Sequence, residues 1–357
     1  MVNAPLNIAE FIKLTGHFPV IDVRSPGEFL QGHIPGAYNI PLFDNEERAK
    51  VGTAYKQIGR EKAIEIGYQV VNPKLKSFID RVQAILSQKL EASNVKPETV
   101  LIHCWRGGMR SAGFAGFLNE HGFKTHTLVR GYKAYRNHVL ENFETISELL
   151  IIGGETGSGK TEILRNIAQT GEQIVDLERL ANHKGSAFGA LGEKAQPTQE
   201  QFENELSSAF SAIDLTKRIW IEDESRSIGK CQLPAPLWEK MKQAPILRIN
   251  FPKALRIERL MSDYGNFSKE ELASCIQKIS KRLGPNHTKH ALEELDGGNL
   301  REVADITLIY YDKAYNYNHE KRNMKDVFFI ESETADPSLN AEKMLTFANQ
   351  KLKHANA

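Results

Sequence analysis

Residues Leu149–Thr161 read LLIIGGETGSGKT, an apolar run that leads into a glycine-rich stretch. The part Gly154–Thr161 fits the pattern GxxxxGK(S/T) and stands between a predicted strand and the predicted helix TEILRNIAQ, as a phosphate-binding loop does. Glycines let backbone N–H groups face a chain of phosphates, Lys160 neutralises the outer oxygens, and the Thr161 hydroxyl is available to a Mg²⁺ ion. The residues predicted to form this site are Gly154, Gly157, Ser158, Gly159, Lys160 and Thr161.

Apolar runs on both sides of this loop predict an α/β protein with two domains. In the second half of the chain, the runs Leu149–Gly154, Gln173–Leu177, Arg218–Glu222, Pro245–Ile249 and Val327–Ile330 predict a doubly wound parallel sheet. In the first half, Pro19–Val23, Thr99–His103 and Thr125–Val129 predict a smaller parallel sheet, which the solvated helical insertion Lys50–Gly67 interrupts. We therefore place the domains at 1–138 and 139–357, the second with a helical C-terminal part.

Composition limits the classes of protein to consider. The 357 residues are 41% hydrophobic, and 46 Lys and Arg face 45 Asp and Glu, so a nucleic-acid partner would be held by local basic patches. The three cysteines lie far apart without CxxC spacing, and no apolar signal segment opens the chain. We expect a reduced, cytoplasmic protein with no transmembrane helix, no membrane partner and no metal site built from cysteine. Cys275 falls on an apolar helix face, which favours core packing. Cys231, in GKCQLP, is interpreted as an ordinary loop cysteine, with a role as a resolving thiol as the alternative.

The third cysteine belongs to a second glycine-rich loop. Residues His103–Ser111 read HCWRGGMRS and directly follow the apolar run Thr99–Ile102. Converging backbone N–H groups, two arginines and the start of a predicted helix at Ser111 favour an anion here. Such surroundings stabilise the thiolate of Cys104, so the stretch predicts nucleophilic sulfur chemistry.

Acidic and polar residues near the phosphate-binding loop are further candidates. Glu222, Asp223 and Glu224 end a predicted strand and could supply an acidic group beside a metal ion, or be exposed charges. Asp176 follows another strand, and the HKGS cluster beyond it could hold a phosphate or a small polar substrate, or be an ordinary loop. The candidates in that cluster are His183, Lys184 and Ser186. A phosphate-binding loop recognises phosphates, so the sequence does not determine which nucleobase, if any, the ligand carries.

Two stretches of the first half resemble rhodanese domains. These are VIDVRSPGEFLQGHIPGAYNIP at Val20–Pro41, similar to their opening motif, and HCWRGGMRSAGFAGFL at His103–Leu118, similar to their active-site loop and following helix. A rhodanese domain joined in this order to a P-loop domain, with LANHKGSAFG at Leu180–Gly189, resembles the tRNA 2-selenouridine synthase family. The similarity spans nearly the whole chain.

The resemblance implies a tRNA-modifying transferase. Members of this family replace the sulfur of wobble 2-thiouridine with selenium from selenophosphate, and they can attach a geranyl group to that sulfur from geranyl diphosphate. For this chain it implies that Cys104 receives or guides selenium, while Arg106, Gly107, Gly108 and Arg110 bind the anionic selenium donor. It implies selenophosphate and geranyl diphosphate as co-substrates and no tightly bound cofactor. The partners would be tRNA and an enzyme that produces selenophosphate.

Basic residues recur at Arg130, Lys133 and Arg136, and again from Lys240 through Arg259 to Arg282. Such runs are either solvated faces or, with a tRNA substrate, contacts to its phosphates.

The spacing around Cys104 departs from the rhodanese pattern. Ordinary rhodaneses have four residues between the cysteine and the arginine, whereas WRGGM puts five between Cys104 and Arg110. This CX5R spacing also occurs in rhodanese-fold phosphatases, although a wider loop equally admits selenium-bearing species. Two other functions therefore stay open: an ATP-dependent tRNA sulfurtransferase, which the absence of an SGGxDS loop disfavours, and a nucleotide-binding regulatory protein with a phosphatase-like rhodanese domain.

Overall fold

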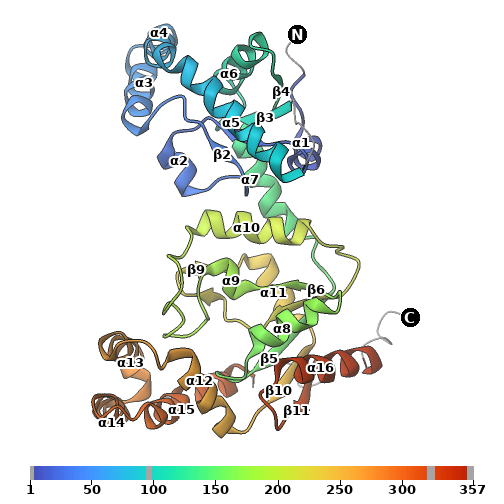
Figure 1. The fold of residues 1–357 in the computed structure, drawn as a ribbon, viewed down its shortest axis with the longest axis vertical. Helices are drawn as coiled ribbons and strands as arrows, with labels where there is room; N and C mark the ends of the chain where they lie inside the picture. The colour runs from blue at the N-terminus through green and yellow to red at the C-terminus, as the bar shows by residue number, and fades with distance from the viewer. Residues whose placement is uncertain (1–3, 94–98, 320–325, 352–357) are drawn as a thin grey trace. The chain divides into compact units, whose positions relative to one another are not determined.

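A computed structural model of the chain describes residues 4–93, 99–319 and 326–351. The chain divides into two compact units, residues 1–142 and 143–357. Each unit is built on its own parallel sheet with helices around it, so the predicted α/β class is confirmed (Figure 1). Within the described residues, no helix combines the length and the apolar character needed to cross a membrane.

The first unit has a parallel sheet in the order β2-β1-β3-β4. Its strands are β1 (Val20–Asp22), β2 (Tyr38–Asn39), β3 (Thr99–His103) and β4 (Lys124–Thr127). Three of them lie in or overlap predicted runs, whereas β2 is two residues long and belongs to no apolar run. Because β3 lies between β1 and β4, Cys104 leaves the sheet at the carboxyl end of an interior strand, where ligands bind in parallel α/β sheets.

Helices flank this sheet and close its core. They are α1 (Ile8–Thr15), α2 (Pro26–Gln31), α3 (Asn45–Gln57), α4 (Arg60–Val71), α5 (Leu75–Ser93), α6 (Met109–Glu120) and α7 (Gly131–Asn142), with a 3₁₀ turn η1 (Asn72–Lys74). Apolar side chains of the sheet, α5 and α6 form one buried cluster that includes Ile21, Phe78, Ile102 and Phe114. The predicted insertion is helical and solvated, since it lies mainly in α3 and α4; Tyr55 of α3 is 59% exposed, and Ile58 between the two helices is 69% exposed.

The second unit has a parallel sheet in the order β11-β10-β5-β7-β6. Its strands are β5 (Leu149–Gly154), β6 (Gln173–Val175), β7 (Ile219–Glu222), β10 (Ile246–Asn250) and β11 (Val327–Glu331). All five lie in or overlap the predicted runs. A two-stranded antiparallel hairpin, β8 (Ser227–Ile228) and β9 (Cys231–Gln232), was not predicted. The phosphate-binding loop follows β5, which is the central strand of the sheet.

The helices of the second unit lie around this sheet and in a separate C-terminal group. They are α8 (Lys160–Gln169), α9 (Leu177–Ala181), α10 (Gln199–Ser211), α11 (Ala235–Gln243), α12 (Lys253–Tyr264), α13 (Lys269–Leu283), α14 (Pro285–Asp296), α15 (Leu300–His319) and α16 (Pro337–Lys351). Leu150, Trp220 and Leu247 of the sheet pack with α8 and α16 in one apolar cluster. Helices α13, α14 and α15 form the predicted helical part, seen together in Figure 1, and Cys275 lies in their apolar core.

Candidate functional site

Cys104 lies at the start of the loop that joins β3 to α6. Its side chain is buried, and Sγ is 3.3 Å from the hydroxyl of Ser111 in the first turns of α6. The Ser111 hydroxyl also lies 3.2 Å from the carbonyl oxygen of Gly108, so it can turn its hydrogen towards either partner. Ser111 belongs to the quoted stretch HCWRGGMRS but was not predicted as a site residue.

The pKa of the Cys104 thiol is lowered below its ordinary value. Burial alone would raise it, but the hydrogen bond from Ser111, the charge of Arg110 and the backbone N–H groups of Ser111 and Gly108 together outweigh the burial. Cys231 and Cys275 are also buried, and for both of them burial is the largest effect and raises the pKa, that of Cys231 to about 11. Among these three thiols, only that of Cys104 has a lowered pKa, which is the direction expected of a reactive thiol.

Two glycines lock the Cys104 loop against the start of α7. Gly107 has φ +62°, and a Cβ there would overlap the carbonyl oxygen of Leu128. Gly131 has φ +55°, and a Cβ there would overlap the carbonyl oxygen of Cys104. The N–H of Tyr132 donates to that same oxygen at 2.8 Å. The loop conformation therefore requires glycine at both positions. Gly131 was not predicted from the sequence, because the Cys104 loop that it contacts is distant in sequence.

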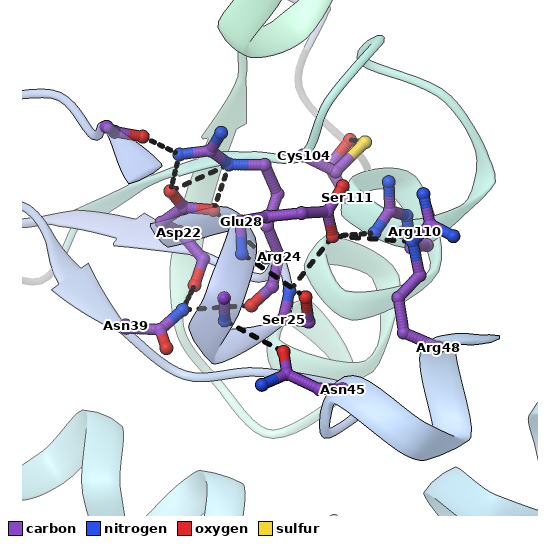
Figure 2. Close-up of polar contacts among 12 residues, drawn as sticks. Asp22, Arg24, Ser25, Glu28, Asn39, Asn45, Arg48, Cys104, Arg110 and Ser111 are labelled. Carbon is purple, nitrogen blue, oxygen red and sulfur yellow. Dashed lines mark hydrogen bonds and ion pairs between the residues drawn. The ribbon is translucent and has the colours of Figure 1, made fainter. Parts of the chain in front are cut away.

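Arg110 is held in place by a carboxylate from another element. Glu28 Oε2 lies 3.3 Å from Arg110 Nη1 and 3.5 Å from Arg48 Nε, and it accepts a hydrogen bond from the N–H of Ser25 (Figure 2). Burial acts to raise the pKa of Glu28, but these partners keep it below its ordinary value. Glu28 of α2 thus holds the side chain of Arg110, which belongs to α6. Arg106, which was also predicted to bind the donor, is exposed.

The stretch Val20–Pro41, which resembles the opening motif of rhodanese domains, holds α2 in place. Arg24 is fully buried, its guanidinium binds Asp22 at 2.6 Å and the carbonyl oxygen of Gly32 at 2.7 Å, and it stacks 3.7 Å from the ring centre of Tyr132. A buried ion pair of this kind is costly to break because either partner alone would be an uncompensated charge. The pair therefore fixes the chain entering and leaving α2, and with it Glu28.

The acidity of Cys104 can be measured directly. Ser111→Ala removes the first hydrogen-bond donor to the thiolate, so we expect the pKa of Cys104 to rise towards the ordinary value for a thiol. The thiolate then appears only at higher pH, which a titration of its ultraviolet absorbance detects when the signal of a Cys104→Ser protein is subtracted. An unchanged titration in Ser111→Ala would show that this hydroxyl does not stabilise the thiolate.

The second candidate site is the phosphate-binding loop between β5 and α8. Gly157 and Gly159 have φ +83° and +73°, in the left-handed region, and Lys160 Nζ donates to the carbonyl oxygen of Gly154 at 3.0 Å. A Cβ at Gly154 would overlap the hydroxyl of buried Ser158, whose Oγ has no hydrogen-bond partner among the described residues. The loop thus has the backbone conformation that a cradle for phosphates needs.

Thr161 contacts a carboxylate that was not predicted. Its hydroxyl donates to Glu178 Oε2 at 2.5 Å, from the short helix α9. Burial raises the pKa of Glu178, and burial together with the charge of Glu178 raises the pKa of Glu224 to about 8. Glu222 is fully buried and accepts the N–H of Leu177 at 2.8 Å. Of the strand-end acids, Glu222 and Glu224 are therefore buried and not exposed charges, whereas Asp223 is partly buried. The charge of Lys160 acts on Glu224.

The residues Asp176 to Ser186 have mixed roles. Asp176 caps α9 by accepting the N–H of Arg179 and pairs with Arg165 at 3.2 Å, which is a structural role. His183 is buried, and burial lowers its pKa. Lys184 pairs with Glu193 at 3.5 Å, and the Ser186 hydroxyl accepts the N–H of Phe188.

The HKGS cluster nevertheless lies beside the phosphate-binding loop. A Cβ at Gly185, within this cluster, would overlap the Glu224 carboxylate, so the cluster passes directly over the acidic group near Lys160.

Arginines from β10 and α12 surround the phosphate-binding loop. Arg248 and Arg256 lie 3.2 and 3.1 Å from the carboxylate of Glu155, and Arg256 also donates to the carbonyl oxygen of Thr156 at 3.2 Å. The guanidinium of Arg259 covers Gly159, where a Cβ would meet its Nη1 at 2.7 Å. Arg259 was grouped with a basic run that could contact tRNA; in the structure it lies beside Gly159 of the phosphate-binding loop and pairs with Glu162 and Asp263.

Comparisons with known proteins cover both units. Residues 8–138 match the rhodanese-like domain, and residues 147–343 match the tRNA 2-selenouridine synthase AAA domain. The tRNA 2-selenouridine synthase of Nitrosomonas europaea is 32% identical over 91% of this chain and 95% of its own length, and that of Bdellovibrio bacteriovorus is 40% identical over 87% and 92%. A solved rhodanese-related protein from Thermoplasma volcanium covers 38% of this chain and 93% of its own, with 16% identity and a TM-score of 0.22. With a family-specific domain over more than half of its length and relatives this similar from end to end, the chain belongs to the tRNA 2-selenouridine synthase family.

Proposed function

We propose that this chain replaces the sulfur of wobble 2-thiouridine in tRNA with selenium from selenophosphate, through an S-geranylated intermediate made from geranyl diphosphate. Membership of the family makes it a tRNA-modifying enzyme. The observation that carries the proposal is the pairing of two different anion sites: an acidified thiol in a glycine-rich loop in one unit, and a phosphate-binding loop in the other. The reaction needs both a selenium donor and an alkyl donor, and both are anions. We place it in the cytoplasm, with an enzyme that produces selenophosphate as partner.

Leaving-group chemistry explains why two sites would be joined. The sulfur at C2 of 2-thiouridine leaves poorly, whereas an alkylated sulfur can depart as a thiol. In the first step the C–O bond of geranyl diphosphate breaks, a C–S bond forms, and diphosphate leaves. In the second step selenium of selenophosphate bonds to C2, the C2–S bond breaks and geranylthiol departs. Water then cleaves the P–Se bond and releases phosphate. No ATP is consumed.

Cys104 and its loop would serve the second step. Arg110, the N–H groups around Gly107 and Gly108, and exposed Arg106 attract the anionic selenium donor. The thiolate of Cys104 takes up the proton that the donor loses as selenium bonds to carbon, and returns it to the departing geranylthiolate. The lowered pKa of Cys104 suits this role because it increases the share of thiolate at a given pH.

The phosphate-binding loop would serve the first step. Lys160 neutralises charge on the diphosphate as it departs, and Arg259 lies where it can share that charge. The surroundings of Thr161 fit a Mg²⁺ ion, because burial and neighbouring carboxylates raise the pKa of Glu178 and of Glu224, and a cation would relieve both effects. Thr161 and Glu178 would hold that ion, which when bound stabilises the leaving diphosphate.

Calorimetric titration distinguishes this proposal from the two alternatives. We expect tighter binding of geranyl diphosphate than of ATP, and a loss of about tenfold to hundredfold in affinity for geranyl diphosphate in Lys160→Ala, since a charged hydrogen bond is removed. Lys242→Ala, the same charge change on exposed α11, is the control and should bind normally. Strong ATP binding with rapid hydrolysis would instead favour the sulfurtransferase or the regulatory protein.

A further inference from the structure

A cavity lined mainly by apolar side chains opens beside the phosphate-binding loop. Its walls come from α12, α13 and α15 and include Leu260, Met261, Leu272, Leu300, Val303 and Ala304. These side chains belong to or pack against two separate apolar clusters, one containing Leu272 and Val303 and the other Ala304 and Leu308. The cavity is thus a seam between two parts of the helical group.

One side of this seam is formed by the phosphate site. Thr156, which lies in the phosphate-binding loop, and Ser186, which follows the glycine beside Glu224, both line the cavity. The carbonyl oxygen of Thr156 is the one that Arg256 binds at 3.2 Å. A ligand whose diphosphate lies on the loop therefore has its remaining part within reach of the apolar seam.

Two hydroxyl groups in the cavity wall, those of Thr307 and Tyr311, have hydrogen-bond partners in the protein. Thr307 donates to carbonyl oxygens of its own helix, at 3.0 Å from Val303 and 3.1 Å from Ala304. The Tyr311 oxygen accepts the N–H of Ala187 at 3.1 Å. A nucleobase carries donors and acceptors that would each need a partner when buried, whereas a hydrocarbon needs none. The chemistry of the wall thus favours a hydrocarbon over a base.

We propose that this cavity receives the hydrocarbon chain of the allylic diphosphate and sets which chain lengths the enzyme accepts. The inference rests on the proposed function, because it assumes that the phosphate-binding loop holds such a diphosphate. The cavity has about 50 Å³ of open space, less than a geranyl chain occupies. The chain therefore enters by displacing side chains, and Met261, whose unbranched thioether adapts its shape readily, is the wall residue best suited to move.

Filling the cavity is the direct test. Ala304→Phe places a ring in the seam, so affinity for geranyl diphosphate should fall by about tenfold or more while affinity for inorganic diphosphate stays the same. Ile309→Phe is the matched control, because Ile309 is on the same helix but 42% exposed and outside the cavity wall. Calorimetric titration of both ligands into the full-length proteins gives the two affinities.

Enlarging the cavity gives an independent test, because the folded protein then does not have to accommodate a larger side chain. Met261→Ala should shift the preference from geranyl diphosphate towards the longer farnesyl diphosphate. If wild-type protein prefers geranyl to inorganic diphosphate but neither variant changes its preferences, the cavity is not the chain site and the proposed function stands. If wild-type protein shows no preference for geranyl over inorganic diphosphate and does not geranylate tRNA, the proposed function fails and this inference with it.

Discussion

Replacing Cys104 with alanine is expected to slow selenium transfer to tRNA by about 10³-fold, within the range that a positioned proton-transfer group contributes. Geranylated tRNA should be formed at the normal rate and accumulate, because the phosphate-binding loop belongs to another unit of the chain. Mass spectrometry of nucleosides from tRNA incubated with both donors measures 2-thiouridine, its geranylated form and 2-selenouridine in one experiment.

The matched control for this variant is Cys231→Ala. Cys231 is also buried, but burial raises the pKa of its thiol and it lies in the second unit, so its loss should leave selenation unchanged. Selenation at the wild-type rate in Cys104→Ala would remove Cys104 from the mechanism. Loss of geranylation together with selenation would mean that the two steps share one site.

Lys160→Ala is expected to abolish selenation of 2-thiouridine tRNA even though Cys104 and its loop are unchanged. Lys160 stabilises the departing diphosphate, and without alkylation the sulfur at C2 has no good way to leave. Supplying tRNA that is already geranylated should restore selenation to nearly the wild-type rate, because the missing step has been carried out beforehand. The same nucleoside analysis gives both rates.

In a double variant with Cys104→Ala and Lys160→Ala, geranylated tRNA should no longer restore selenation, since the second step then lacks the thiol of Cys104. Lys242→Ala again controls for the loss of one positive charge. If Lys160→Ala selenates ungeranylated tRNA normally, alkylation is a side reaction, and leaving-group chemistry does not explain why the two units are joined.

Strands with continuous apolar runs could be predicted from the sequence, and short strands could not. Runs such as Leu149–Gly154 and Thr99–His103 coincide with β5 and β3 because interior parallel strands are buried on both faces. Strand β2 has only Tyr38 and Asn39, both partly exposed, and the hairpin β8–β9 is equally short. Such strands form because neighbouring strands or a turn place them, so local sequence carries little signal for them.

The loops that carry the chemistry were found because glycine and lysine or cysteine fall at fixed spacings. Their partners were missed because they come from distant elements. Glu28 reaches Arg110 from α2, and Glu178 reaches Thr161 from α9, so only the folded chain brings them together. Glu28 did give one signal, its place in the capping box of α2, but that pattern indicates a helix start and nothing about catalysis. The catalytic and binding roles of the predicted residues stay predictions.

The ribosome delivers Cys104 well before the residues that shape its loop. Until Gly131 and Tyr132 have been added, the carbonyl oxygen of Cys104 lacks the N–H group that holds it, and Gly107 lacks the backbone against which it packs. A nascent chain that ends before Gly131 therefore lacks the backbone contacts that hold the loop around Cys104.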